Sequence, residues 1–131
     1  MTTNEPTGSE LPRPNLPPCF KVDGLMPCGM WRIQTPLALP DGSLVDAFWG
    51  KNDNGAFFVS DLGEAENWVY LLGKRTRGKK ACVEACEADL VDGEILRAVD
   101  PVEGDVVAIF CVAMAVYCMC LDTIEETTNA N

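Results

Sequence analysis

Residues 106–121 read VVAIFCVAMAVYCMCL, a run of sixteen residues without a charged side chain. No glycine or proline interrupts the run, which is typical of a helix. Asp100, Pro101 and Glu103 precede it with residue types that favour the N-cap, the first position and the third position of a helix. The sequence therefore predicts one long helix over about residues 102–124.

This predicted helix is apolar on every side, as helices are in a protein core or in a membrane. A bilayer span takes about 17–25 apolar residues, and lysine or arginine beside the span sets its orientation. The run is slightly shorter than that and has acidic residues at both ends. We therefore expect burial within the protein and no membrane. In so small a chain, the second face of the helix needs a cover, either from the other helices or from a homodimer.

Apolar runs separated by turn residues precede the long helix, and Asp41-Gly42 and Asp92-Gly93 are the clearest turn signals. The predicted strands are residues 30–35, 44–49 and 56–60 and the hairpin 90–99, and the predicted short helices are residues 61–72 and 81–88. These elements indicate an α+β fold. We expect an antiparallel sheet of about five strands, a three-stranded meander plus a hairpin, packed on two short helices and one long apolar C-terminal helix.

The first 18 residues hold five of the nine prolines and few large apolar side chains. Such a segment buries too little surface to offset its ordering entropy. We therefore predict disordered tails over residues 1–18 and 126–131 around a single α+β domain over residues 19–125. The start of the sequence lacks the basic and apolar regions of a signal peptide, and the cysteine count is odd, so we expect a cytoplasmic protein with reduced thiols.

The residue types of common active sites are sparse in this chain. Histidine is absent, which excludes the usual Ser-His and Cys-His nucleophile pairs. The sequence also lacks a glycine-rich phosphate loop and a pair of acids followed by a lysine, as metal-dependent nucleases use. We expect a non-enzymatic protein with no catalytic residues, no bound metal and no cofactor.

The seven cysteines support an alternative function. Cys82 and Cys86 lie one turn apart on a predicted helix, and Cys118 and Cys120 form a second near pair. Zinc sites usually combine cysteine pairs in loops or cysteine with histidine, so inert thiols in the core explain these positions better. A redox role needs a lowered thiol pKa, which the basic residues just before Cys82 can supply. A cysteine-based metal or redox regulatory module therefore stays the alternative.

The net charge is confined to the last third of the chain. Residues 1–83 carry nine acids and nine bases, whereas residues 84–131 carry eleven acids and one base, Arg97, which gives the net charge of −10. A solvated surface explains an acidic protein, but the asymmetry favours a surface that attracts basic partners. The expected contact residues surround the second hairpin and the start of the long helix: Asp89, Asp92, Glu94, Asp100, Glu103 and Asp105.

Residues 74–80 hold five of the ten bases and follow Trp68 and Tyr70. Such a cluster contacts phosphates in nucleic-acid-binding proteins. The isoelectric point of about 4.3 nevertheless lies far below the value of roughly 9 that is typical of those proteins. We expect no direct nucleic-acid binding, and the cluster to pair with acids of the chain itself or of a partner.

Short turn motifs follow one another along the chain: Thr35-Pro36, Asp41-Gly42, Ser60-Asp61-Leu62-Gly63 and Val91-Asp92-Gly93. In these motifs and in its closing apolar helix, the chain resembles a family of short prokaryotic and phage proteins that is catalogued only as a domain of unknown function. The resemblance covers about residues 30–124. It implies a phage or mobile-element setting and brings no catalytic residues. The cysteines of the last helix and the basic residues 74–80 are not features of that family.

These observations favour a small acidic binding protein. We expect its acidic face to engage a basic surface of a larger complex that handles nucleic acid. Because a basic channel reads the spacing of charges, carboxylates on a ridge can act as a nucleic-acid mimic. A phage-encoded or mobile-element inhibitor of host defence fits this description. The alternatives are the cysteine-based module and a homodimeric accessory subunit that hides the long helix at its interface.

Overall fold

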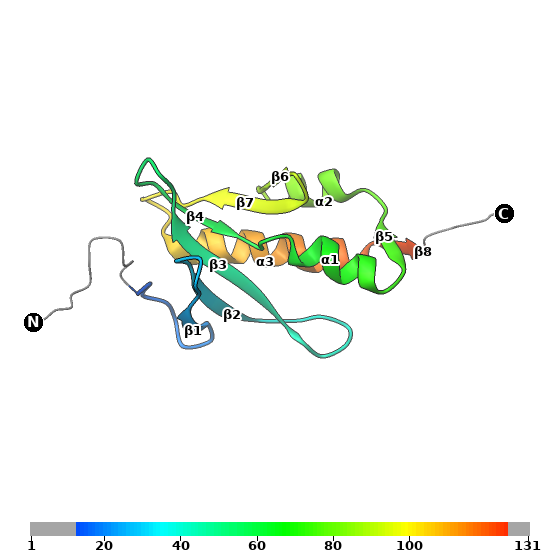
Figure 1. Ribbon diagram of the computed structural model, residues 1–131, viewed down its shortest axis with the longest axis horizontal. Helices are drawn as coiled ribbons and strands as arrows, with labels where there is room; N and C mark the ends of the chain where they lie inside the picture. The colour runs from blue at the N-terminus through cyan, green and yellow to red at the C-terminus, as the bar shows by residue number, and fades with distance from the viewer. Residues whose placement is uncertain (1–12, 126–131) are drawn as a thin grey trace, which may run out of the picture.

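The computed structural model describes residues 13–125, and its main feature is a six-stranded sheet (Figure 1). The strand order is β1-β2-β3-β4-β7-β6, and all neighbouring strands are antiparallel. The strands are β1 (Lys21–Leu25), β2 (Trp31–Ala38), β3 (Leu44–Lys51), β4 (Phe57–Ser60), β6 (Asp89–Val91) and β7 (Glu94–Ala98). The predicted meander is β2–β4 and the predicted hairpin is β6–β7, so the α+β class is confirmed, with one strand more in this sheet than expected.

Three helices and a two-stranded sheet complete the described part of the chain. They are α1 (Glu64–Leu71), α2 (Lys79–Ala85) and α3 (Asp105–Leu121), with the antiparallel strands β5 (Lys74–Thr76) and β8 (Thr123–Glu125). In Figure 1, α3 lies behind the large sheet. It contacts β2, β3, β4 and β7, and α1 and α2 both pack against it.

The core lies between the sheet and one side of α3. Val45, Ala47 and Trp49 alternate along β3, so they share one face of the sheet. They belong to one buried cluster with Ile109 of α3. The indole N–H of Trp49 donates a hydrogen bond of 2.8 Å to Asp105 Oδ1, which holds the start of α3 against β3.

The predicted start of the long helix is wrong, because α3 begins at Asp105 and its N-cap is Gly104. Asp100 Oδ1 instead accepts the Val102 N–H at 2.8 Å and stabilises a turn before the helix. Gly104 follows this turn with φ 92°, a conformation that favours glycine. An acidic residue two or three positions before free N–H groups suits a turn as well as a helix cap, so the local sequence did not distinguish them.

Three strands lie outside the predicted pattern: β1, β5 and β8. Each is short and rich in charged or polar residues, so none shows an apolar run. In addition, β2 continues through Pro36 to Ala38, although a stop at this proline was expected. The register of β2 and β3 shifts between Gln34 and Ala38, and such an irregularity accommodates a residue without an N–H group.

Residues 13–18 are the part of the predicted N-terminal tail that the structure describes. They form no helix or strand, but Pro14 is buried and the Arg13 guanidinium lies 5.7 Å from the centroid of the Trp31 ring. The rest of the predicted tails, residues 1–12 and 126–131, lies outside the described residues.

Candidate protein-binding surface

The six predicted contact acids lie along the β6–β7 hairpin and at the start of α3, but they do not form one cluster. Asp89 and Asp100 line a shallow hollow of about 400 Å³ beside β7, together with Glu87. Asp92, in the turn between β6 and β7, borders a different cavity. The carboxylates of Asp89 and Asp92 have no hydrogen bond or ion pair within residues 13–125, and both residues are exposed, so both side chains are available to a partner.

The other contact candidates are partly engaged within the fold. Glu94 accepts a hydrogen bond from the Ser60 hydroxyl of β4, and Asp105 accepts the Trp49 N–H. Both acids are half-buried. Glu103 pairs with Arg97 at 2.8 Å. These contacts join elements of the domain, so Glu94 and Asp105 stabilise the fold and are less available to a partner.

Arg97, the base of the acidic third, is held by its acidic neighbours. Its guanidinium lies 2.8 Å from Glu103 and 3.5 Å from Glu87, and its side chain is only 14% exposed. It also donates to Cys111 Sγ on α3 at 2.8 Å. The charged side chains that line the hollow beside it are therefore three carboxylates and one base, Arg97, which is already paired, so the hollow has a net negative charge.

Asp61 is a buried carboxylate that links three elements, and the sequence indicated only part of this role. It has no exposed surface. Its Oδ1 accepts the N–H groups of Gly63 and Ile95, each at 2.8 Å, and its Oδ2 accepts the Ala65 N–H at 3.0 Å. Burial raises the pKa of Asp61, while these three N–H groups act in the opposite direction. The bond to Ile95 joins the start of α1 to β7, 34 positions along the chain, and no local signal predicts it.

A second carboxyl group, Glu64, lies beside Asp46 at a small cavity of about 210 Å³. Asp46 Oδ2 accepts two N–H groups of Arg32, at 3.0 and 2.9 Å, while its buried Oδ1 has no hydrogen-bond partner in the described structure. Partial burial raises the pKa of Glu64, and the charges of Asp46 and Asp61 raise it further, against the opposing charge of Arg32.

We expect Glu64→Gln to make the domain more stable at neutral pH. A raised pKa means that the folded state holds the proton of Glu64 more tightly than the unfolded chain does. Wild-type stability is therefore lost as the pH rises through the pKa of the folded state. Glutamine does not ionise, so the variant avoids this loss. Because Glu64 is accessible to solvent, we expect the gain in the free energy of unfolding to be less than about 1 kcal/mol. Urea unfolding between pH 4 and pH 8 measures the effect, and a gain that stays the same down to pH 4 would contradict the explanation.

Three of the five basic residues in 74–80 are paired with acids of the chain itself, which was one of the two expected kinds of partner. Lys79 bonds to Glu66, Arg77 lies 3.7 Å from Asp122, and Lys80 lies 3.9 Å from Glu84. Lys74 and Arg75 belong to β5 and have no ion pair within residues 13–125.

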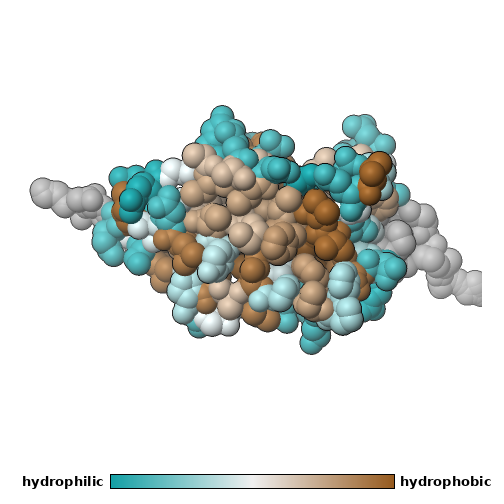
Figure 2. Space-filling model, turned by 180° about the vertical axis from the view of Figure 1, so that it is seen from behind, coloured by the Kyte–Doolittle hydropathy of each residue, from teal (hydrophilic) through white to brown (hydrophobic). Residues whose placement is uncertain are grey.

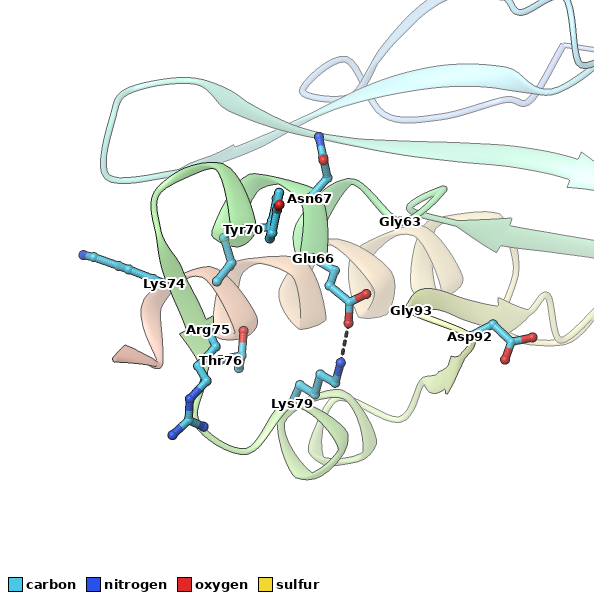
Figure 3. A pocket seen from close by; sticks show the side chains of 11 residues that line it. Gly63, Glu66, Asn67, Tyr70, Lys74, Arg75, Thr76, Lys79, Asp92 and Gly93 are labelled. Atoms are coloured by element: carbon cyan, nitrogen blue, oxygen red, sulfur yellow. Dashed lines mark hydrogen bonds and ion pairs between the residues drawn. The ribbon is translucent and has the colours of Figure 1, made fainter. Parts of the chain in front are cut away.

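A cavity of about 580 Å³ lies between α1, β5 and the β6–β7 turn. Figure 3 shows Glu66 and Lys79 pointing toward each other beside it, whereas the side chains of Lys74 and Arg75 extend away from this pair. The positive charge of Lys79 is neutralised by Glu66, so this cavity has no converging cluster of free cations for a phosphate.

The cysteines differ from the expected core thiols, since only Cys120 is buried. Cys82, Cys86, Cys111 and Cys118 are half-buried, and Cys86 Sγ lies 3.8 Å from Cys118 Sγ. Among the described residues, no group of three or more Cys, Asp or Glu side chains is placed to hold a metal ion.

The hypothesis of thiols with a lowered pKa is wrong. Burial, the hydrogen bond to Cys118 and the neighbouring thiols raise the pKa of Cys86 to about 11. Burial and the charge of Asp122 raise the pKa of Cys82. The nearby bases do not lower these values, because Lys79 and Lys80 pair with Glu66 and Glu84. Since the thiolate is the reactive form, both thiols are slow nucleophiles at neutral pH.

Apolar side chains gather on the face of the molecule that is turned away from the sheet. Figure 2 shows this face from behind, with hydrophobic colours over its centre, where α3 lies. Phe110 and Leu121 are 45% and 48% exposed, so the other elements do not fully cover the long helix. No helix within residues 13–125 has the length and hydropathy of a membrane span.

No protein-family model matches the chain, and no curated protein or solved structure is similar to it.

Proposed function

We propose that this chain is a non-enzymatic, acidic binding protein whose partner presents a basic surface. The hollow beside β7 carries the proposal. Its rim holds Glu87, Asp89 and Asp100, and the single nearby base, Arg97, is already bound to acids. A surface of one charge sign attracts an oppositely charged partner and raises the rate of encounter.

The class of partner follows from the same charge pattern. A surface that binds a phosphate backbone is basic and tolerates different sequences, because it recognises charge more than base identity. A protein with a net charge of −10 competes with nucleic acid for such a surface. We therefore propose a larger complex that handles nucleic acid as the partner, and a phage or mobile-element inhibitor of host defence as the biological role. A cytoplasmic location belongs to the same proposal.

The alternative of a redox or metal module has weaker support. The raised pKa values of Cys82 and Cys86 slow oxidation by peroxide and binding of metal, since both reactions require the thiolate.

A charge-variant pull-down tests the proposal. The tagged protein is incubated with host lysate at low salt, eluted in a salt gradient, and the recovered proteins are identified by mass spectrometry. Asp89→Lys with Asp100→Asn changes the charge of the hollow by +3 and keeps an acceptor in the turn. We expect about a tenfold loss of affinity for the recovered basic partner, which corresponds to about 1.4 kcal/mol, and a weaker dependence on salt.

The matched control is Asp23→Lys with Asp41→Asn, which changes the charge by the same amount. Asp23 lies on β1, at the opposite edge of the sheet from β6, and Asp41 lies in the turn between β2 and β3. We expect this variant to bind nearly as well as the wild type. Equal losses in both variants would show that net charge, and not the hollow, drives binding. Partners that are indifferent to salt would refute the proposal.

A further inference from the structure

The outward side of α3 is a continuous apolar stripe. Val107, Phe110 and Leu121 are 36%, 45% and 48% exposed. The stripe residues are all exposed or half-buried: Val107, Phe110, Cys111, Met114, Tyr117, Cys118 and Leu121. Cys118 contacts Cys86 and Cys111 contacts Arg97 at one edge of the stripe, and its exposed remainder lies in the apolar centre of the face in Figure 2.

The stripe has a defined shape, and Met114 lies at its centre. Positions 107, 110, 114, 117 and 121 follow one another at alternating steps of three and four, the spacing of two helices that pack side by side. At roughly 100° per residue, the stripe residues span an arc of about 120°, with Met114 in the middle. Met114 is also midway along the stripe, seven positions from each end.

The helix α2 borders the stripe and carries small apolar residues. Ala81 and Ala85 are exposed there, and Cys82 and Cys86 are half-buried. The contact between Cys86 and Cys118 joins this side of α2 to α3. Small side chains beside the stripe let another helix approach closely.

We propose that this face binds a second copy of the chain, with Met114 of each copy near a two-fold axis. A two-fold interface brings the same patch together from both copies, so the patch must be self-complementary. This stripe meets that condition because it carries no charge from Val106 to Leu121. The flanking acids, Asp105 and Asp122, lie at the two ends of α3 and outside the stripe.

The size of the face suits a dimer of moderate strength. A helix of 17 residues is about 26 Å long, and a face two helices wide offers roughly 500 Å² per protomer. Stable interfaces bury about 800 Å² per partner, so we expect dissociation in the micromolar range. The inference is independent of the proposed function, since the acidic hollow does not belong to the stripe.

The dependence on salt concentration distinguishes this dimer from the proposed binding of a basic partner. Each copy carries a net charge of −10, so two copies repel each other at low ionic strength. Salt screens this repulsion without weakening apolar burial, so the dimer should become tighter as salt rises. Binding of a basic partner should become weaker under the same conditions.

Sedimentation equilibrium of the full-length chain under reducing conditions is the test. We expect a monomer–dimer equilibrium that favours the dimer at higher salt. Met114→Lys and Met114→Glu should each be monomeric, because like charges meet near the axis, and an equimolar mixture of the two should associate again. Val102→Lys is the control, because Val102 is 94% exposed in the turn before α3 and lies off the stripe.

Circular dichroism establishes that each variant is folded. A second variant, Phe110→Ser, replaces an exposed stripe residue and should weaken dimerisation at least tenfold. A wild type that stays monomeric at about 100 μM, or that associates without limit, would overturn the proposal. So would a dimer that is indifferent to both Met114 variants, or monomeric Met114 variants that fail to associate when mixed.

Discussion

Replacement of Asp61 by alanine is expected to lower the free energy of unfolding by about 3–5 kcal/mol, a large part of the stability of a domain of this size. The carboxylate accepts three backbone N–H groups in a site without exposed surface. Alanine leaves all three donors buried and unpaired, and each unpaired donor costs about 1–3 kcal/mol. Urea unfolding at pH 7 measures the loss.

The controls for Asp61 separate burial from hydrogen bonding. Asp41→Ala removes a carboxylate that bonds to Ser43 in an exposed turn, and we expect a loss below about 1 kcal/mol. Asp61→Asn keeps one acceptor but turns an NH₂ group toward backbone donors, so it should also be strongly destabilising. Amide exchange should become faster at Ile95 and Ala65 in both Asp61 variants. Unchanged protection at Ile95 would contradict the link from the start of α1 to β7.

The second large effect compares two neighbours on α3. Ile109 has no exposed surface and packs in the core cluster, whereas Phe110 is 45% exposed on the outward stripe. We expect Ile109→Ala to cost about 2–5 kcal/mol through lost burial and a cavity. Phe110→Ala should cost roughly 1 kcal/mol or less in the monomer. Urea unfolding at low protein concentration measures both values without a contribution from dimerisation.

A reversed order of these two effects would mean that α3 turns Phe110, and not Ile109, toward the sheet. It would also remove the basis for the proposed dimer, because Phe110 would then belong to the core. Equal and large effects would show that both sides of α3 are buried within one chain, as a fully covered helix requires. Ile109→Ala and Phe110→Ala together therefore test the orientation of α3 on which the proposed dimer depends.

Much of the fold could be predicted because its signals are local. The Asp41-Gly42 and Asp92-Gly93 turns and the apolar runs beside them indicated β2 to β4, β6 and β7. A turn needs particular backbone angles, and few residue types supply them, so short sequences are informative. The strands β1, β5 and β8 carry no such signal, since they are short, contain charged or polar residues and show no apolar run.

The candidate site was less predictable for a related reason. Charge and its position along the chain are properties of the sequence, so the acidic last third follows from the sequence alone. Which acids remain free depends on partners that are distant in sequence. Trp49 binds Asp105, 56 positions away, and Ser60 binds Glu94, 34 positions away. Neither pairing follows from spacing along the chain.

The long apolar helix shows the same division. Its existence, its lack of charge and its place near the end of the domain follow from residues 106–121, because an apolar run of sixteen residues without glycine or proline is longer than a typical strand and favours a helix. Which side of that helix is covered follows only from the tertiary structure. All its sides are apolar, so hydrophobicity along the chain does not distinguish them. The sheet packs on the side of Ile109 and leaves Phe110 and Leu121 in solvent, because one face of a sheet can cover only one side of a helix.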